Sequence, residues 1–362
     1  MKRLIISLFV YTTVVCATTI NVPADYTTIQ AGIDASSNGD TVLVQSGTYT
    51  GSGNKDLEIG GKSITIISAS GATSTIIDCE NNGRGFLFPQ EQGATLILDG
   101  FTIQNGTPND GNDGGGILCI SGNSLTIKNC IIKNNQNSGL YFSYCSPIVI
   151  NCIISGNTSE WWGGGLNLDQ SAAEIKNCLI SGNTSPGKGG GIVVQHNSPN
   201  IVNCTITENS APEGGGIYCY QAFPTVTNSI LWNDAPEEVY FDDSFNSNSI
   251  MIAYSDIQGG SAGIVTNNNG TVYWETGNIN TDPLFTDEGG GDYTLQSGSS
   301  CIDAGTALFV WQGDTLVNLS PGEYVDSDPD MGAFEYDVVS TTEDFPLTPY
   351  KFVLHQNYPN PV

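Results

Sequence analysis

Basic residues are scarce in this sequence. Its 362 residues include 10 Lys and Arg against 37 Asp and Glu, which gives a formal net charge of −27 at pH 7. Such an acidic surface repels the phosphates of nucleic acids and anionic lipids, so neither is an expected partner. It is compatible with solubility outside the cell and with bound cations.

Patterns of His and Cys that bind metals are also missing. The chain has two His residues, His196 and His355, and no Cys-x-x-Cys pair, whereas zinc sites are built from such groups. Ten Cys residues would suggest disulfides in an exported protein. Four of them instead recur at one position of a repeat, where Cys serves as a small buried hydrophobe: Cys130, Cys152, Cys178 and Cys204. Disulfides between stacked neighbours remain the alternative.

Long apolar runs are confined to the N-terminus. Lys2 and Arg3 precede an apolar stretch that ends at Cys16, and Ala17 completes a small-residue cleavage pattern. We therefore predict that residues 1–17 are a secretory signal peptide. No later stretch approaches the roughly 18 apolar residues of a membrane span, so the mature protein is expected to be exported and soluble.

One short phrase recurs five times between residues 125 and 241. Its first half runs from Ile or Val through Asn to Cys or Ser, as in Ile127-Lys128-Asn129-Cys130-Ile131, and the steps between its Asn residues are 22, 26, 26 and 25. These residues are Asn129, Asn151, Asn177, Asn203 and Asn228. Its second half is a glycine run that opens an apolar triplet, as in 189–192. Such a period indicates a solenoid whose units bury their apolar faces only by stacking.

The apolar runs decide which kind of solenoid forms. Each is three to six residues long, rich in Ile, Val and Thr, and bounded by Asn, Gly, Ser or Pro. Such runs are strands, because a helix needs ten or more residues. Three strands and three turns in each period predict an all-β fold, a parallel β-helix with about ten coils spaced about 4.8 Å apart. Ile201, Cys204, Ile206, Ile217 and Cys219 should point inward.

A second Asn follows the first by six residues. This set comprises Asn135, Asn157, Asn183 and Asn209. We expect it at sharp corners, because Asn tolerates the left-handed backbone conformation and bonds its own backbone. Stacked side chains of the set should also bond one another along the solenoid.

Residues 20–50 are expected to cap the open apolar end that a solenoid would otherwise expose. The segment 20–22 predicts a short strand. Residues 25–37 predict a helix with Ile29 and Ile33 on its buried face, ended by Asn38-Gly39. The segment 41–44 then begins the first coil.

Several further motifs carry a family resemblance. They include Val22-Pro23-Ala24-Asp25-Tyr26, Gly39-Asp40-Thr41-Val42, Gly100-Phe101-Thr102-Ile103, Asp282-Pro283-Leu284-Phe285, Cys301-Ile302-Asp303-Ala304-Gly305 and Asp330-Met331-Gly332-Ala333-Phe334. Through them, residues 20–337 resemble exported bacterial proteins of the pectate-lyase-like superfamily. The resemblance implies a right-handed parallel β-helix domain over residues 18–337. It does not select an activity, because the superfamily includes lyases, hydrolases, epimerases and adhesins.

The C-terminal residues resemble a second family. Residues 338–349 read as a polar linker with Pro346 and Pro349, and the segment 350–362 is similar to the first strand of the sorting domain on type IX secretion cargo. That domain needs several more strands, so we expect a truncated copy here. The resemblance implies outer-membrane-associated export and display on the surface of a bacterium.

The strand after each glycine run carries the candidate functional residues. Its outward positions are polar and aromatic in the middle of the repeat, and a preceding loop contains two adjacent Trp residues. We predict that rings and hydrogen-bonding groups form a glycan-binding platform here, made of Trp161, Trp162, Asn167, Asp169, Gln195, Tyr218, Tyr220 and Tyr141. The alternative is that the Trp side chains fold back and pack on the solenoid wall.

The same face offers weaker candidates for catalysis, namely Asp169, Lys188 and His196. A polysaccharide lyase needs a cation against the uronate carboxylate and a base for the C5 proton, and Lys188 is the only basic residue expected in this cleft. A glycosidase needs two carboxyl groups about 5–9.5 Å apart. Asp169 and Asp242 should lie three coils, or about 14 Å, apart.

These observations predict a secreted or cell-surface monomer that binds a polysaccharide or cell-surface glycan, or mediates adhesion, without catalysis or a resident cofactor. The alternative is a polysaccharide lyase or another carbohydrate-active enzyme that acts on acidic polysaccharide. Calcium is the one metal ion suggested. Asp326, Asp328 and Asp330 alternate as carboxylates do in calcium loops, although Pro329 and Met331 stand where such a loop needs flexibility.

Overall fold

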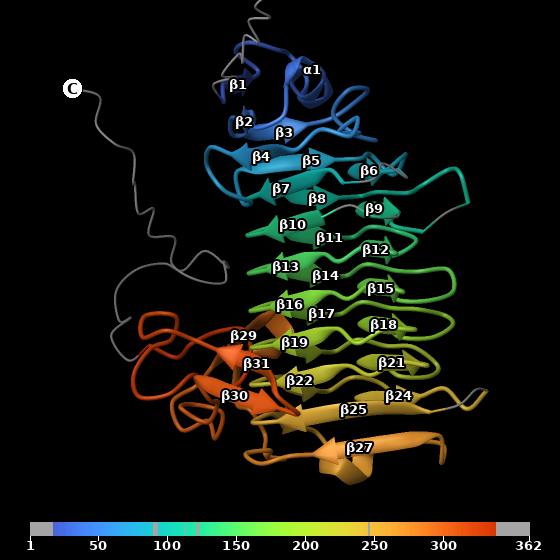
Figure 1. The fold of residues 1–362 in the computed structure, drawn as a ribbon, viewed down its shortest axis with the longest axis vertical. Coiled ribbons are helices and arrows are strands. Elements are labelled where there is room, and N and C mark those ends of the chain that lie inside the picture. The colour runs from blue at the N-terminus through green and yellow to red at the C-terminus, as the bar shows by residue number, and fades with distance from the viewer. Residues whose placement is uncertain are drawn as a thin grey trace, which may run out of the picture.

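The computed structural model describes residues 17–89, 93–111, 113–120, 122, 124–244 and 247–337. Most of the predicted signal peptide and all of the predicted linker and sorting-domain segment lie outside these residues. The described chain forms a parallel β-solenoid of about ten coils, as the repeat predicts. Figure 1 shows the coils stacked from α1 (Ile29–Ala35) at one end to β27 (Gly270–Trp274) at the other.

Three parallel sheets run along the solenoid, and the central coils add one strand to each. Sheet A consists of β1 (Thr19–Val22), β2 (Thr41–Val44), β4 (Ile64–Ser68), β7 (Thr95–Asp99), β10 (Ser124–Lys128), β13 (Ile148–Ile150), β16 (Glu174–Lys176), β19 (Asn200–Val202), β22 (Thr225–Thr227), β25 (Asn248–Ala253) and β27. Sheet B consists of β3 (Gly47–Tyr49), β5 (Thr75–Asp78), β8 (Thr102–Gln104), β11 (Ile131–Lys133), β14 (Ile153–Ser155), β17 (Leu179–Ser181), β20 (Thr205–Thr207), β23 (Ile230–Trp232) and β26 (Asp256–Ile257). Sheet C consists of β6 (Phe86–Phe88), β9 (Ile117–Ile120), β12 (Leu140–Ser143), β15 (Leu166–Asp169), β18 (Ile192–Gln195), β21 (Ile217–Tyr220) and β24 (Val239–Phe241).

A single apolar core runs through the coils. The predicted inward residues, from Ile201 to Cys219, are all fully buried. The four Cys residues of the repeat also lie in this core as thiols. Each sulfur donates to the backbone carbonyl two residues earlier, as Cys178 Sγ does to Lys176 O at 3.1 Å. These four cysteines are therefore small buried hydrophobic residues, as predicted.

The second Asn set forms a continuous ladder inside the solenoid. Asn157 Nδ2 donates to Asn183 Oδ1 at 3.0 Å, and Asn183 Nδ2 donates to Asn209 Oδ1 at 2.9 Å. The second amide hydrogen of Asn183 goes to the carbonyl of Ile154, and its oxygen also accepts the backbone N–H of Asn157. All four side chains are buried, so the ladder satisfies polar groups that water cannot reach.

The left-handed corners belong to the other Asn set. Asn129, Asn151, Asn177 and Asn203 have φ values of 56°, 53°, 50° and 50°. The ladder residues are not among the described residues with positive φ, so the prediction that they form the left-handed corners is wrong. The two sets therefore have different roles. The set that begins at Asn129 turns the backbone, and the ladder that begins at Asn135 satisfies buried hydrogen-bonding groups.

A pair of carboxyl groups ends the ladder. Asp234 Oδ1 accepts from Asn209 N and Nδ2 at 2.7 and 2.9 Å, and Glu238 Oε1 accepts the backbone N–H of Asp234 at 3.2 Å. The remaining oxygens, Asp234 Oδ2 and Glu238 Oε2, are buried without a hydrogen-bond partner in the described part of the chain. Burial raises the pKa of Asp234 to about 7 and that of Glu238 to about 10. The Asp234 carboxylate adds to the rise at Glu238, whereas hydrogen bonds from Glu238 and Asn209 oppose the rise at Asp234.

Replacing Asp234 with Asn is expected to stabilise the protein at pH 8 by about 1–3 kcal/mol. The amide oxygen can still accept from Asn209, and the amide nitrogen replaces a buried carboxylate oxygen that has no donor among the described residues. Both carboxyls bind protons more tightly in the folded chain than their ordinary values of about 3.9 and 4.3 allow. The free energy of unfolding should therefore fall as pH rises from about 4 towards about 10, and less steeply in the variant. Urea unfolding across this range measures both effects, with exposed Asp314→Asn as control. Equal or lower stability of Asp234→Asn at pH 8 would contradict the prediction.

The N-terminal cap forms with a shorter helix than expected. α1 begins after Thr28, whose Oγ1 accepts the backbone N–H of Ala31, and it ends at Ala35. Asp25, predicted inside the helix, instead accepts the backbone and side-chain N–H groups of Asn21 and holds a turn. Ile29 and Ile33 are fully buried, so the helix covers the end of the core.

The C-terminal part of the domain folds back onto the outside of the later coils, over sheet B and sheet A. It contains the hairpins β28 (Phe285–Asp287) with β29 (Asp292–Leu295) and β30 (Leu308–Trp311) with β31 (Asp314–Asn318), and two short 3₁₀ segments, η1 (Gly260–Gly263) and η2 (Glu288–Gly290). A second apolar cluster joins Phe285, Leu295 and Met331 to Leu179 and Ile230. This segment covers sheet B in the later coils, and β31 lies against β19 and β22 of sheet A, whereas the candidate site lies on sheet C.

Candidate functional site on sheet C

Sheet C aligns the candidate residues in two rows. Its strands pair in parallel register, so residues at equivalent positions follow one another along the solenoid. The second position of each strand gives the row Tyr141, Asn167, Val193, Tyr218 and Tyr240. The fourth position gives the row Ser143, Asp169, Gln195 and Tyr220. The predicted site residues of these strands thus share one outward face.

Glycine runs fold the preceding loops over this face. Gly163, Gly189 and Gly214 have φ values of 67°, 64° and 64°, a conformation that glycine adopts without strain. A Cβ on Gly189 would lie 2.2 Å from Val193 Cγ2. Just before these glycines, Trp162, Lys188 and Glu213 align across successive coils, so the loops carry their side chains over the rows of sheet C.

Aromatic rings from several coils meet beneath and beside these loops. Trp162 packs edge-to-face on Tyr218 and Tyr220, with ring centroids 5.7 and 5.9 Å away. Tyr218 stacks on Tyr240 at 5.7 Å, and His196 lies edge-on to Tyr220 at 5.0 Å. We call these five residues the aromatic cluster.

One lysine ties the cluster to two carboxylates. Lys188 Nζ lies 2.8 Å from Asp242 Oδ2 and 3.3 Å from Glu213 Oε2, and it donates to Tyr218 OH at 2.5 Å. Tyr218 OH donates in turn to Asp242 Oδ2. The ammonium also stands over the Trp162 and Tyr218 rings, 5.5 and 4.8 Å from their centroids, within range of a cation–π interaction.

The ion pair fixes the protonation states of its members. Burial disfavours the charges of both Lys188 and Asp242, but their mutual attraction outweighs it. The pKa of Asp242 is lowered to about 2 by hydrogen bonds from Lys188, Tyr218 and Ser244. The pKa of Lys188 is raised by Asp242 and Glu213. Lys188 is therefore a protonated cation near neutral pH and a poor general base.

Two predicted contact residues are covered. Tyr218 is fully buried and Asn167 nearly so, because Trp162 and Lys188 lie over Tyr218 and Gln195 Nε2 donates to Asn167 Oδ1 at 2.8 Å. The expectation that both side chains lie open to a ligand is therefore wrong. They support the residues above them.

The other predicted residues are at least partly exposed to solvent. Tyr141, Trp162, Asp169, Gln195 and Tyr220 are half-buried and His196 is exposed. Trp161 is 69% exposed, so the two Trp residues differ: Trp162 packs on the tyrosines and Trp161 projects into solvent. Asp169 Oδ2 accepts from Ser143 at 3.3 Å. Asp169 and Asp242 belong to coils three strands apart, well beyond the spacing of a glycosidase pair.

Comparison with known proteins places the fold in a family. The family model described as "Right handed beta helix region" matches residues 27–231 and 90–282. The chain belongs to the right-handed β-helix family. No curated protein matches this β-helix chain in sequence. Among solved structures it is similar to the crystal structure of pectate lyase Pel9A, with a TM-score of 0.52 and 15% identity over 85% of this chain and 91% of that one.

The calcium candidates of this β-helix protein lie far along the chain from the sheet C rows. Asp330 is buried, and its two oxygens accept the backbone N–H groups of Asp303 and Tyr336. Asp326 and Asp328 are exposed. Throughout the described ranges, no three His, Cys, Asp or Glu side chains form a group that could hold a metal ion. The same ranges contain no helix long and apolar enough to cross a membrane.

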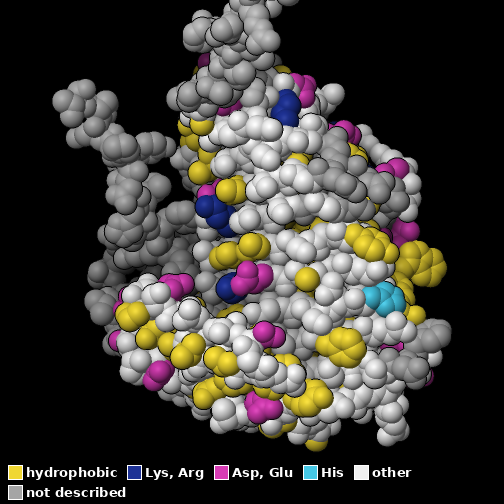
Figure 2. Space-filling view, viewed as in Figure 1, with side chains coloured by type: hydrophobic (Ala, Val, Ile, Leu, Met, Phe, Trp, Pro, Cys, Tyr) yellow, Lys and Arg dark blue, Asp and Glu magenta, His cyan; other side chains and the backbone are white. Residues whose placement is uncertain are grey.

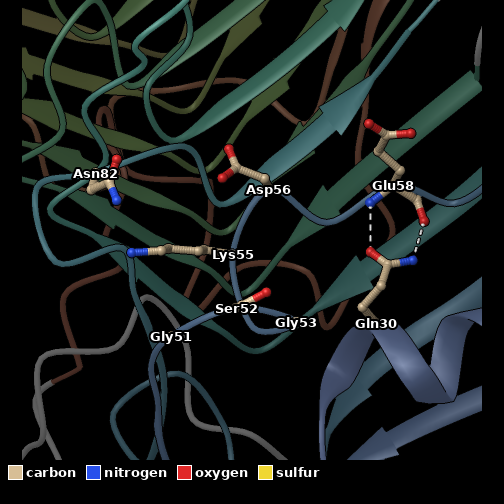
Figure 3. Close-up of a pocket in the computed structure, with 8 residues that line it drawn as sticks. All are labelled: Gln30, Gly51, Ser52, Gly53, Lys55, Asp56, Glu58 and Asn82. Carbon is tan, nitrogen blue, oxygen red and sulfur yellow. Dashed lines mark hydrogen bonds between the residues drawn. The ribbon is translucent and has the colours of Figure 1, made fainter.

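The surface of the β-helix has a hollow near the N-terminal cap, and its polar groups bond other parts of the fold. Lys and Arg side chains are few and scattered on the face in Figure 2. Figure 3 shows a polar hollow near the cap, where Gln30 exchanges hydrogen bonds of 3.0 and 2.9 Å with the backbone of Glu58. There, Lys55 pairs with Glu80 at 3.1 Å, and Asp56 accepts the backbone N–H of Arg84 at 2.7 Å.

Three members of the site of this β-helix lie on the expected face or its loops but are not among the predicted binding residues: Glu213, Tyr240 and Asp242. A signal for them exists in the sequence. Glu213 precedes a glycine run just as Lys188 does, and Tyr240 follows Tyr218 in the outward row. The link from Lys188 to Asp242 crosses two coils and depends on how the loops fold, so the repeat alone does not reveal it.

Proposed function

We propose that this β-helix protein binds glycans on the exterior of sheet C without catalysis, as a secreted or cell-surface monomer. The observation that carries the proposal is the aromatic cluster, in which four successive coils bring together Trp162, His196, Tyr220 and Tyr240 over buried Tyr218. Rings of this kind stack on sugars, and neighbouring polar groups hydrogen-bond their hydroxyls. Asp169 and Gln195 stand in the same row as Tyr220.

The charges favour an uncharged glycan. Lys188 is already neutralised by Asp242 and Glu213, and the chain carries a net charge of −27. A polyuronate would meet repulsion, and no free cation of the described residues stands beside the rings. A neutral polysaccharide or cell-surface glycan avoids that cost, and retention of such a glycan on neighbouring cells would make the protein an adhesin.

A polysaccharide lyase is the second candidate, favoured by the structural likeness to a pectate lyase. Against it stands the raised pKa of Lys188, whose ammonium is held by two carboxylates and so provides no base for the C5 proton. Incubation with pectate and other uronates, with and without calcium, distinguishes the two. Absorbance growing near 235 nm would replace the binding proposal with the lyase.

Affinity electrophoresis through gels that contain neutral polysaccharides tests the binding proposal. The parent protein should be retarded by at least one glycan, and the double variant Trp161→Ala/Trp162→Ala should migrate as in an empty gel. Trp311→Ala is the matched control, because Trp311 packs on Tyr273 in a hairpin outside sheet C. Trp161 is mostly exposed, so Trp161→Ala alone should leave the melting temperature unchanged. A parent protein retained by no glycan, or a double variant retained as strongly as the parent, would overturn the proposal.

A further inference from the structure

Two cysteines outside the repeated Cys position meet in the core beneath sheet C. Cys119 is the third residue of β9, paired with Phe142 of β12, and Cys145 follows the end of β12. Their Sγ atoms lie 2.7 Å apart, and both residues are buried. That separation is much shorter than an ordinary non-bonded contact between sulfur atoms and somewhat longer than the S–S bond of about 2.05 Å.

The geometry of this pair differs from that of the four repeated cysteines. Those occupy the same position in successive coils, and each sulfur donates to the backbone carbonyl two residues earlier, as Cys152 Sγ does to Ile150 O (3.2 Å) and as Cys145 Sγ also does to Ser143 O (3.4 Å). Cys119 instead lies within a strand, whereas Cys145 lies in the turn of the next coil, three residues beyond the strand partner of Cys119. The two side chains therefore approach from a strand and from a turn, which lets the sulfurs meet head-on.

We propose that Cys119 and Cys145 are joined by a disulfide in the mature protein. The two thiols lose two protons and two electrons as the S–S bond forms, and a small-molecule or protein disulfide accepts the electrons by thiol–disulfide exchange and becomes two thiols. The expected export of the chain would bring it to an oxidising compartment, where such bonds persist. Because both sulfurs are buried, the bond forms before the two coils close or during their transient opening.

The bond would link two neighbouring coils across 26 residues. It would lie under the first coils of the proposed glycan site, since Phe142 points inward beside Cys119 and its neighbour Tyr141 faces outward in the sheet C row. A cross-link at this point constrains the unfolded chain and fixes the register of the two coils. The bond does not depend on the proposed function.

Peptide mass spectrometry of the exported protein tests the proposal. After denaturation without reductant and alkylation with N-ethylmaleimide, the peptides of Cys119 and Cys145 should be joined, 2 Da lighter than their sum, and should separate with reductant. Cys178 and Cys204 should be alkylated throughout, which serves as the internal control. Full alkylation of Cys119 and Cys145 without reductant, after incubation with oxidised glutathione, would overturn the proposal.

Melting curves supply an independent measurement. Reductant should lower the melting temperature of the parent protein and leave that of Cys119→Ser unchanged, while Cys178→Ser should respond to reductant as the parent does. A parent melting temperature unaffected by reductant would count against the bond. If Cys119→Ser does not fold, the mass-spectrometric result on the parent still decides.

Discussion

Replacing Ile206 with Asp is expected to abolish folding. Ile206 is fully buried in β20, where it pairs with Ile180 on one side and Leu231 on the other. The carboxylate would have no cation and no water, and an isolated buried charge costs many kcal/mol, comparable to the total stability of about 5–15 kcal/mol of a typical domain. Circular dichroism and gel filtration of the purified variant measure the outcome.

Cys178→Ser is the control for this core position. Cys178 is as deeply buried as Ile206, but a hydroxyl can donate to Lys176 O as the thiol does, so the loss should be about 1 kcal/mol. A folded Ile206→Asp protein with a melting temperature near that of the parent would show that the core admits water. A large loss in Cys178→Ser that reductant reproduces in Cys119→Ser, which lacks the proposed Cys119–Cys145 bond, would show that the repeated cysteines are disulfide-bonded.

Replacing Lys188 with Met should lower the free energy of unfolding by about 3–5 kcal/mol, the usual cost of leaving one member of a buried pair uncompensated. The side chain of Asp242 is only 2% exposed and would keep its negative charge without the ammonium 2.8 Å away. Adding Asp242→Asn to Lys188→Met should recover most of this loss, since no charge is then left unpaired. Urea unfolding of both single variants and the double variant gives the coupling energy.

Lys176→Met is the matched control, because Lys176 pairs with Glu174 at the surface, where ion pairs contribute about 0–1 kcal/mol. The pH dependence has a defined sign. Because the pKa of Asp242 is lowered to about 2, its contribution is complete above about pH 4 and lost as pH falls towards 2. The Lys188→Met variant should show a weaker acid-side dependence, because hydrogen bonds from Tyr218 and Ser244 still favour the ionised carboxylate. A loss no larger than that of Lys176→Met would show that the pair does not stabilise the fold.

The repeat specified most of the fold because every coil buries apolar residues and turns the chain at equivalent positions. The positions of Ile206, Cys204 and Cys219 follow from strand alternation, and the Asn183 ladder follows from the regular period, so each was predictable without neighbours from elsewhere in the chain. The register of sheet C likewise placed Tyr220 beside Gln195. The residues through which each coil packs on the next recur with the period of the sequence.

What could not be predicted depends on packing between unlike segments. Tyr218 was expected on the open surface, but Lys188 and Trp162 lie over it from earlier coils. The helix was expected from Asp25, but that carboxylate binds Asn21 instead. Asp234 and Glu238 end the Asn ladder with two carboxyl groups. Their pKa values are raised by burial, and burial at these positions does not follow from the sequence pattern. In each case the deciding contact joins residues that the period does not relate.

The Lys188 network has a consequence for how the solenoid opens. Coils touch mainly their nearest neighbours, so amide hydrogen exchange through local opening would ordinarily proceed one coil at a time. Lys188, Glu213 and Asp242 belong to three successive coils, and the Lys188–Asp242 pair spans residues 54 apart in the sequence. No one of these coils can detach without breaking an ion pair with another. The amides of β18, β21 and β24 should therefore exchange together, as one cooperative unit.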